Sequence, residues 1–212
     1  MLRLLLPIVV VVATVGSAHA GPDDRNRGRR HDAGQFFMRL SAGFGFNSAA
    51  FDDSAETTLR GGGALASLAF GATIAPNIAL GVDVFGLSMV QPSIRQNGRD
   101  LGDAEGTKAS LGAIGLGATF YVMPANIYFA AALGVGVGTL EFEGQFGPFN
   151  VRTKEDTDPG LAANLMVGKE WWVSRRWGLG LALQAILASV EADDGTGLGV
   201  FGIGLLFSAS MN

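Results

Sequence analysis

The segment from Gln35 to Asn47 alternates between apolar residues and small or polar ones with a period of two. Its apolar positions are Phe36, Met38, Leu40, Ala42, Phe44 and Phe46. The positions between them are mostly small or polar, among them Arg39 and Ser41. Because successive side chains of an extended strand point to opposite sides, this pattern predicts a β-strand with two chemically different faces.

The same alternation recurs along the chain and predicts eight strands. They are expected at residues 36–46, 63–73, 78–90, 108–122, 127–140, 160–173, 177–190 and 198–208. Short turns at 75–77, 123–126 and 174–176 alternate with long polar loops at 47–62, 91–107, 141–159 and 191–197. An even number of strands with this alternation is typical of an outer-membrane barrel. We therefore predict an all-β, antiparallel, up-and-down eight-stranded transmembrane β-barrel over residues 35–212.

Composition and the placement of charge indicate which solvent the apolar face meets. Hydrophobic residues make up 48% of the chain and charged residues 16%, with 32 glycines. Past residue 20, no apolar run approaches the roughly 18 residues of a spanning helix. On the apolar face, Lys108 and Lys169 lie near strand ends, where a lysine can reach the interface. Because a charge in mid-bilayer costs about 2–4 kcal/mol, we expect this face to contact lipid.

The N-terminal segment Met1–Ala20 has the pattern of a signal peptide. Arg3 precedes an apolar run, and the run ends in a small-residue cleavage site at Ala18–Ala20. The run is shorter than the roughly 20 residues that a membrane anchor needs. Residues 21–34 are polar and charge-rich, which predicts a flexible periplasmic arm.

The last strand carries a glycine, an apolar residue and an aromatic residue at Gly202, Leu205 and Phe207. With the strand pattern, this resembles the small outer-membrane barrels of the OmpA/OmpX type over residues 35–212. The resemblance implies an assembly signal in these three residues, and lipid, lipopolysaccharide and the barrel-assembly machinery as partners. It also implies periplasmic termini and extracellular long loops. The chain departs from the family in continuing to Asn212 after Phe207, and no cell-wall-binding domain follows the barrel.

Three charged residues fall on the small, inward face of the strands: Arg39, Asp83 and Glu170. Their similar depth predicts an internal ion pair or triad, since buried charges are tolerated mainly when paired. We expect Arg39 to lie within salt-bridge distance of Glu170 or Asp83. A structural plug of the lumen and a gate for water or small ions both remain open at this stage.

Aromatic residues gather around two of the short turns and predict a girdle at one membrane boundary. These are Trp171, Trp172, Trp177, Tyr121 and Tyr128.

Acidic residues cluster in the expected loops: Asp52, Asp53 and Glu56; Asp100, Asp103 and Glu105; Glu155, Asp156 and Asp158; and Asp193 and Asp194. None of these clusters has the spacing of a recognised calcium loop, so we expect solvated charge and no metal or cofactor. The loops could still present a surface to an extracellular partner. The net charge of −4 gives no basis for binding nucleic acid.

Catalysis by an activated serine usually needs a histidine base. His19 leaves with the signal peptide and His31 lies in the polar arm, so we expect no enzyme. The match Gly197–Gly202 to G-x-G-x-x-G enters a strand and not a helix, which excludes a dinucleotide site. The expected role is envelope integrity or surface interaction. The alternatives are a narrow channel for water, ions or small solutes and, after it, a lipid-modifying enzyme.

Overall fold

The computed structural model describes residues 31–146, 149–192 and 195–211, so the expected signal peptide and residues 21–30 lie outside it. Its strands are β1 (Phe36–Phe51), β2 (Thr58–Ala75), β3 (Ile78–Val90), β4 (Ser93–Gln96), β5 (Arg99–Asp103), β6 (Thr107–Val122), β7 (Ile127–Phe146), β8 (Phe149–Asp156), β9 (Asp158–Trp172), β10 (Trp177–Glu191) and β11 (Gly197–Met211). Within these residues, no helix is long and apolar enough to cross a membrane.

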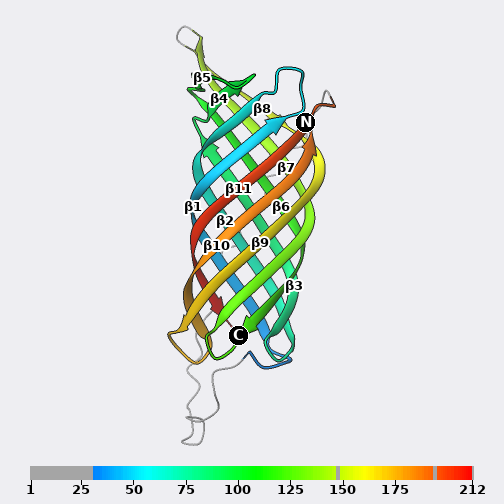
Figure 1. Ribbon diagram of the computed structural model, residues 1–212, viewed down its shortest axis with the longest axis vertical. Coiled ribbons are helices and arrows are strands. Elements are labelled where there is room, and N and C mark those ends of the chain that lie inside the picture. Colours follow the sequence, from blue (N-terminus) through cyan, green and yellow to red (C-terminus); the bar gives the residue numbers. More distant parts are fainter. Residues whose placement is uncertain (1–30, 147–148, 193–194, 212) are drawn as a thin grey trace, which may run out of the picture.

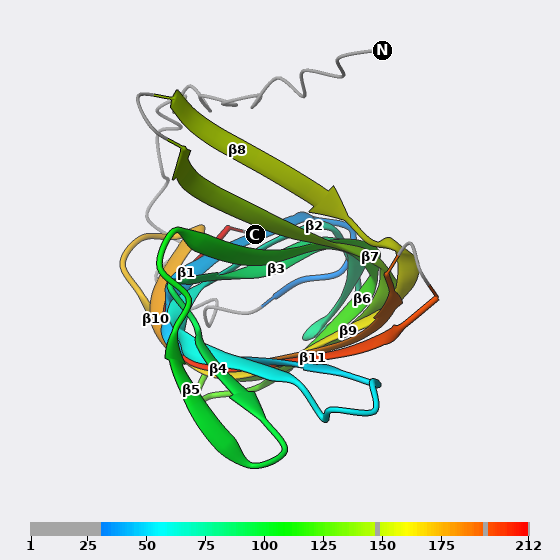
Figure 2. The ribbon, with the colours of Figure 1, turned by 90° about the horizontal axis from the view of Figure 1, so that it is seen from above.

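Eight of the strands close into a barrel, which confirms the predicted fold (Figures 1 and 2). Around the wall their order is β1, β11, β10, β9, β7, β6, β3 and β2, and β1 also pairs with β2 to complete the circle. Each of these pairings is antiparallel. Closure leaves these eight strands without a free edge along the paired part of the wall.

Two of the connections expected as long loops form β-hairpins, and this corrects the sequence prediction. The connection after β3 contains the paired strands β4 and β5, and the strand β7 continues to Phe146 and pairs with β8. The turn between β4 and β5 is Asn97–Gly98, with both residues at positive φ. Asn-Gly is a strong signal for a two-residue hairpin, so the sequence did contain the evidence for β4 and β5.

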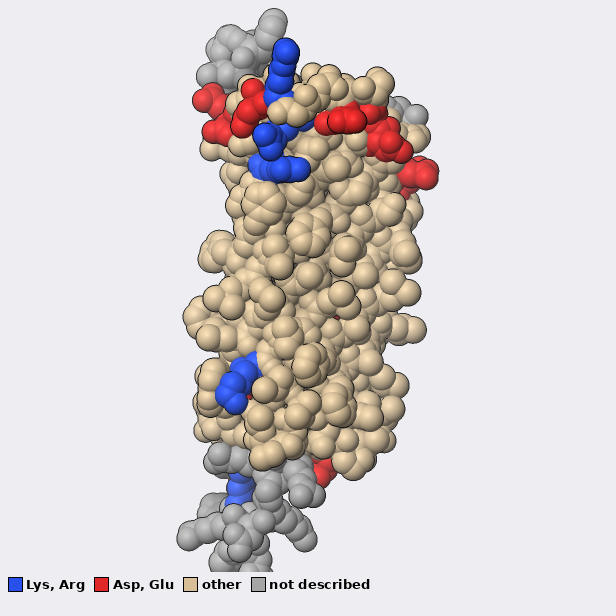
Figure 3. All heavy atoms as spheres, viewed as in Figure 1, with Lys and Arg blue, Asp and Glu red and all other residues tan. Residues whose placement is uncertain are grey.

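The outer surface of the barrel is apolar, as the alternation predicts. Phe44, Leu116 and Phe207 are 79%, 76% and 76% exposed. On the face shown in Figure 3, the charged side chains gather mainly at the end with the long connections, above a broad uncharged band. This arrangement suits a hydrocarbon environment, because the charges lie outside the band where they would be costly.

The core fills the inside of the barrel. Toward the long connections, apolar side chains from all around the wall form one cluster that includes Leu65, Phe85, Leu87, Met89, Leu111, Ile186 and Leu206. Toward the short turns, a second cluster contains Phe37, Tyr121, Tyr128 and Met166. The inward face is therefore not made of small residues alone, because large apolar side chains fill the lumen at two levels.

Candidate functional site

The predicted charged residues lie in the lumen, with their side chains turned away from the outer surface. Arg39 projects from β1, Asp83 from β3 and Glu170 from β9, and they are 1%, 3% and 2% exposed. Alternation along each strand places them there, since their neighbours in sequence point outward. Buried charges of this kind need polar partners nearby.

Asp83 takes part in a hydrogen-bonded relay across three strands. Asn164 Nδ2 donates to Asp83 Oδ2 at 2.9 Å, and Gln184 Nε2 donates to Asn164 Oδ1 at 2.8 Å. The relay joins β3, β9 and β10 across the inside of the barrel. It fixes the Asn164 amide orientation, because its oxygen accepts from one neighbour while its nitrogen donates to the other.

The other two charged groups have separate partners. Arg39 Nη1 donates to Thr119 Oγ1 at 3.1 Å, and the guanidinium carbon lies 4.6 Å from the centroid of the Tyr128 ring. Glu170 Oε2 accepts a hydrogen bond of 2.6 Å from Ser210 Oγ.

The direct ion pair expected for Arg39 is not formed in the described part of the chain. No Arg39 nitrogen lies within 4.0 Å of a carboxylate oxygen of Asp83 or Glu170. The physical reason is that a hydroxyl and an aromatic face hold the guanidinium, while Asn164 and Ser210 hold the carboxylates.

The space left inside the barrel is small. A cavity of about 10 Å³ borders Arg39, Asp83 and Thr119, and another of about 20 Å³ lies among Leu87, Met89 and neighbouring apolar residues. A cavity of this size holds about one water molecule. We call the lumen side chains that make these contacts the polar belt: Arg39, Asp83, Thr119, Asn164 and Gln184. One packed cluster lies from the belt toward the long connections, and the other lies toward the short turns.

The aromatic girdle is corrected at two positions. Tyr121 and Tyr128 are 1% and 0% exposed and close the lumen near the short turns. Phe120 and Phe129, their neighbours in sequence, are 50% and 52% exposed on the outer face. The period of two could have made this distinction, because residues adjacent in a strand point to opposite faces.

The three tryptophans also differ in placement. Trp171 is 52% exposed on the outer face, whereas Trp172 is half-buried with its ring centroid 5.2 Å from that of His31. Trp177 is also half-buried and begins β10. Of the three, Trp171 is thus the most exposed to the surroundings of the barrel.

His31 belongs to the mouth of the barrel, which corrects the end of the expected polar arm. It is 1% exposed, its ring stacks on Tyr121, and its Nε2 donates to Asn126 Oδ1 at 3.2 Å. Asn77 N donates to the His31 carbonyl oxygen at 3.0 Å. Two short turns therefore hold this residue in place. No feature of the sequence indicated this, because a histidine in a charged segment reads as solvated.

Comparison with known proteins supports the fold and not a specific activity. No protein-family model and no curated protein matches the sequence. Among solved structures, Neisserial surface protein A is similar with a TM-score of 0.55 and 12% identity, covering 83% of this chain and 96% of that one. The outer membrane protein OprG from Pseudomonas aeruginosa is 16% identical, with a TM-score of 0.47, covering 87% and 99%.

This chain has the fold of the small outer-membrane β-barrels. The closed eight-stranded wall and the apolar outer surface agree with that assignment. The chain is accordingly a closed, transmembrane eight-stranded β-barrel.

At one end of this barrel, the two hairpins project from different sides of the mouth (Figure 2). Among the described strands, β5 pairs with β4 alone and β8 with β7 alone, so each leaves one edge unpaired. All five residues of β5 are exposed. Free strand edges can pair with an added strand, and charged residues such as Arg99 and Asp103 limit that pairing.

The remaining predicted residues lie as follows. On β11, Gly202 faces the interior of the barrel, while Leu205 and Phe207 are 62% and 76% exposed on the outer face. Their role as an assembly signal stays a prediction. Among the acidic loop residues that the structure describes, no group of three or more could hold a metal ion, and Asp193 and Asp194 lie outside those residues.

Proposed function

We propose that this protein is a non-enzymatic surface platform of the outer membrane, in which the barrel is the anchor and the hairpins β4–β5 and β7–β8 make the contacts. The observation that carries the proposal is that the paired wall continues past the closed barrel into these hairpins. A barrel that only filled its place in the membrane would not need such extensions.

The packed lumen supports an anchor more than a transport path. Apolar side chains fill one part of it, and Tyr121, Tyr128 and His31 fill the mouth near the short turns. His31, which would otherwise be the candidate base for serine catalysis, is engaged in stacking and in a hydrogen bond. This arrangement favours a structural use of the interior.

The proposal includes an orientation, with the short turns in the periplasm and the hairpins outside. Support comes from the two ends of the described chain, which both lie at the short-turn end. Met211 pairs with Met38 and Trp177, and His31 packs beside Asn126. A chain exported by a signal peptide and inserted from the periplasm would keep both ends there.

Complementation of a deletion strain tests the proposal. One strain carries the wild-type chain, and a second carries a variant in which residues 93–103 are replaced by a short Gly-Ser link, which removes β4 and β5. We expect the variant to restore the resistance of the cells to detergent. We do not expect it to restore the binding of extracellular partners to the cell surface. Equal surface binding with and without the hairpin would contradict the platform. Failure of the variant to restore detergent resistance would indicate that envelope integrity depends on it.

A narrow channel is the second candidate, and the polar belt around Arg39 and Asp83 favours it. Recording in planar bilayers separates the two. A platform gives no discrete conductance steps for the wild-type barrel, whereas a channel gives steps that change when Asp83 is replaced by Asn. The Leu87→Ala variant, which thins the apolar cluster, reports whether that cluster closes the path.

A further inference from the structure

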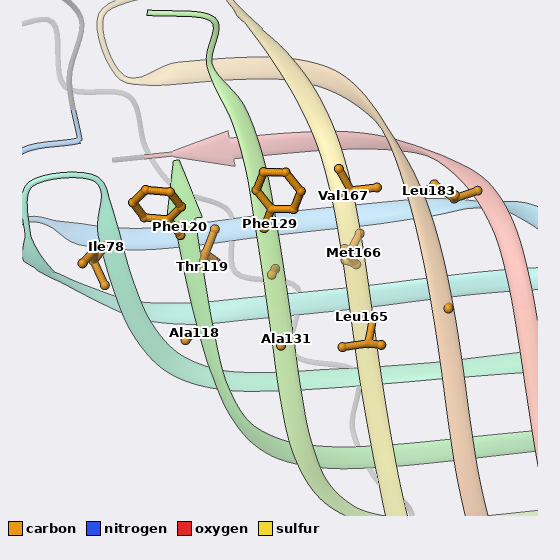
Figure 4. A pocket seen from close by; sticks show the side chains of 12 residues that line it. Ile78, Ala118, Thr119, Phe120, Phe129, Ala131, Leu165, Met166, Val167 and Leu183 are labelled. Carbon is orange, nitrogen blue, oxygen red and sulfur yellow. The ribbon is translucent and has the colours of Figure 1, made fainter. Parts of the chain in front are cut away.

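The outer face of the barrel is hollowed next to the membrane boundary at the short-turn end. A depression of about 640 Å³ runs across β6, β7, β9 and β10, bordered by Phe120, Phe129, Val167 and Leu183 (Figure 4). A second depression of about 730 Å³ adjoins it and shares Ala118, Ala131 and Leu165 with the first. Both are open to the surroundings and lined almost entirely by apolar atoms.

The register of the sheet explains this hollow. Ala118 pairs with Ala131, so two small side chains lie side by side on the outer face. The next outward-facing pair toward the short turns is Phe120–Phe129, and the next one away from them is Leu116–Leu133. Large side chains thus form ridges on both sides of a floor of alanine.

A cation lies at the short-turn side of the hollow. Lys169 is exposed on the outer face of β9, on the same face as Val167 and Leu165. Along a strand, the four residue steps from Leu165 to Lys169 span roughly 13 Å. Lys169 Nζ donates to the Ala125 carbonyl oxygen at 2.7 Å and lies 5.7 Å from the centroid of the Trp171 ring. An ammonium group has three donors, so this one bond leaves capacity for an anion.

Two further cations follow Lys169 in the sequence. Arg175 and Arg176 are exposed in the turn that follows β9. The carboxylate nearest in sequence, Glu170, is turned into the lumen, where it accepts from Ser210. A negative group at Lys169 would therefore meet no exposed acid from β9 or its turn, and the exposed acid Asp32 lies at the same end of the barrel, next to His31.

We propose that this hollow and Lys169 bind one anionic glycerophospholipid from the leaflet that meets the short turns. An acyl chain lies in the hollow over Ala118 and Ala131, and the phosphate contacts the Lys169 ammonium beside Trp171. The distance along β9 suits such a molecule, whose headgroup stays at the interface while its chain enters the hydrocarbon. The inference is independent of the role of the hairpins.

Native mass spectrometry of the barrel released from bicelles tests the proposal. The bicelles contain equal amounts of phosphatidylglycerol, phosphatidylethanolamine and phosphatidylcholine with identical acyl chains. We expect retention of phosphatidylglycerol over phosphatidylcholine by about 1.5- to 5-fold, the range that an exposed ion pair gives. Lys169→Gln should abolish this preference, and Ala131→Leu, which fills the hollow, should reduce retention of all three lipids.

Matched variants serve as controls, and several outcomes would overturn the proposal. Lys108→Gln removes an outer-face lysine at the opposite end, and Ala66→Leu enlarges an exposed alanine on β2. Both should retain lipid as the wild type does, and heat-modifiable migration on gels verifies that every variant is folded. Equal retention of the headgroups by the wild type, an unchanged preference in Lys169→Gln, or a second copy of the chain in place of lipid would each contradict it.

Quenching of Trp171 provides an independent measurement. In a background with Trp172→Phe and Trp177→Phe, brominated phosphatidylglycerol should quench this fluorophore more strongly than brominated phosphatidylcholine does. The difference should vanish with Lys169→Gln. Equal quenching by both lipids would argue against a headgroup site at this position.

Discussion

The ring of His31 stacks on the ring of Tyr121, with centroids 3.5 Å apart and planes inclined by 19°. Tyr121 is also in contact with Tyr128 and Phe37, at centroid distances of 5.8 Å and 6.4 Å. A residue of the segment that leads into β1 (Phe36–Phe51) thereby becomes part of the plug at the short-turn mouth. The closed end of the barrel depends on side chains from the wall and from the segment that leads into it.

Replacing His31 tests how much that stack stabilises the barrel. We expect His31→Ala to lower the free energy of unfolding by about 1–3 kcal/mol, because the stack is lost and the buried Asn126 side chain loses a donor. His31→Phe keeps an aromatic ring without the hydrogen bond and should cost less. Urea unfolding in detergent micelles, followed by tryptophan fluorescence, measures both. A His31→Ala variant as stable as the wild type would show that the mouth closes without this residue.

Gly168 is a second test of packing in the plug. A Cβ atom there would lie about 2.5 Å from Cε1 and Cζ of the buried Tyr128 ring. We expect Gly168→Ala to destabilise the barrel by about 1–3 kcal/mol, as overpacking does. Gly112→Ala is the matched control, since a Cβ there has no heavy atom within 4 Å. The cost of Gly168→Ala should be smaller when it is measured in a Tyr128→Ala background. An equal cost of Gly168→Ala in both backgrounds would contradict the proposed clash.

Asn164 is the centre of the polar relay. Asn164→Leu removes the donor to Asp83 and the acceptor for Gln184. We expect the free energy of unfolding to fall by about 3 kcal/mol or more, because one of the two groups left without a partner is a carboxylate. Adding Asp83→Asn to this variant should recover part of the loss, because a neutral amide is cheaper to leave without a partner. Unfolding in urea measures the set. No recovery in the double variant would mean that the Asp83 charge contributes little to the cost.

The membrane-facing surface can be tested with a single charge. Leu116 is 76% exposed on β6, within the apolar band, whereas Leu101 is 62% exposed on the hairpin strand β5. We expect Leu116→Arg to make folding into lipid vesicles less favourable by about 2–4 kcal/mol. Leu101→Arg should leave it unchanged. Equal effects at the two positions would contradict the assignment of the band.

Asp53, in the connection between β1 and β2, should titrate with a lowered pKa because of its hydrogen bonds. Its Oδ1 accepts from Thr57 N at 2.9 Å, and the hydrogen bonds from Thr57 hold the pKa of Asp53 below its ordinary range. Because the folded pKa is the lower one, this contribution to stability is present above the ordinary value of about 3.9 and is lost as the pH falls through the folded pKa. The Thr57 amide shift in NMR should follow that transition, with a midpoint below 3.9. Asp53→Asn should abolish it.

The alternation of residue types predicted which way most side chains face, because the pleat of a strand allows two directions only. It placed Arg39, Asp83 and Glu170 in the lumen. The same rule applied to Tyr121 and Tyr128 would have placed them inside as well. Grouping those tyrosines by their nearness to a turn, and not by the face they share, led to the wrong assignment.

The sequence by itself therefore determined the number of barrel strands, their antiparallel order and the apolar outer surface, since these follow from a period that each strand carries locally. Tertiary structure alone decided which lumen groups meet. Arg39 donates to Thr119, Asn164 donates to Asp83, and Ser210 donates to Glu170, and each pair joins strands that are distant in sequence. The physical reason is that the register and closure of the barrel set distances across the lumen, and no local pattern encodes them.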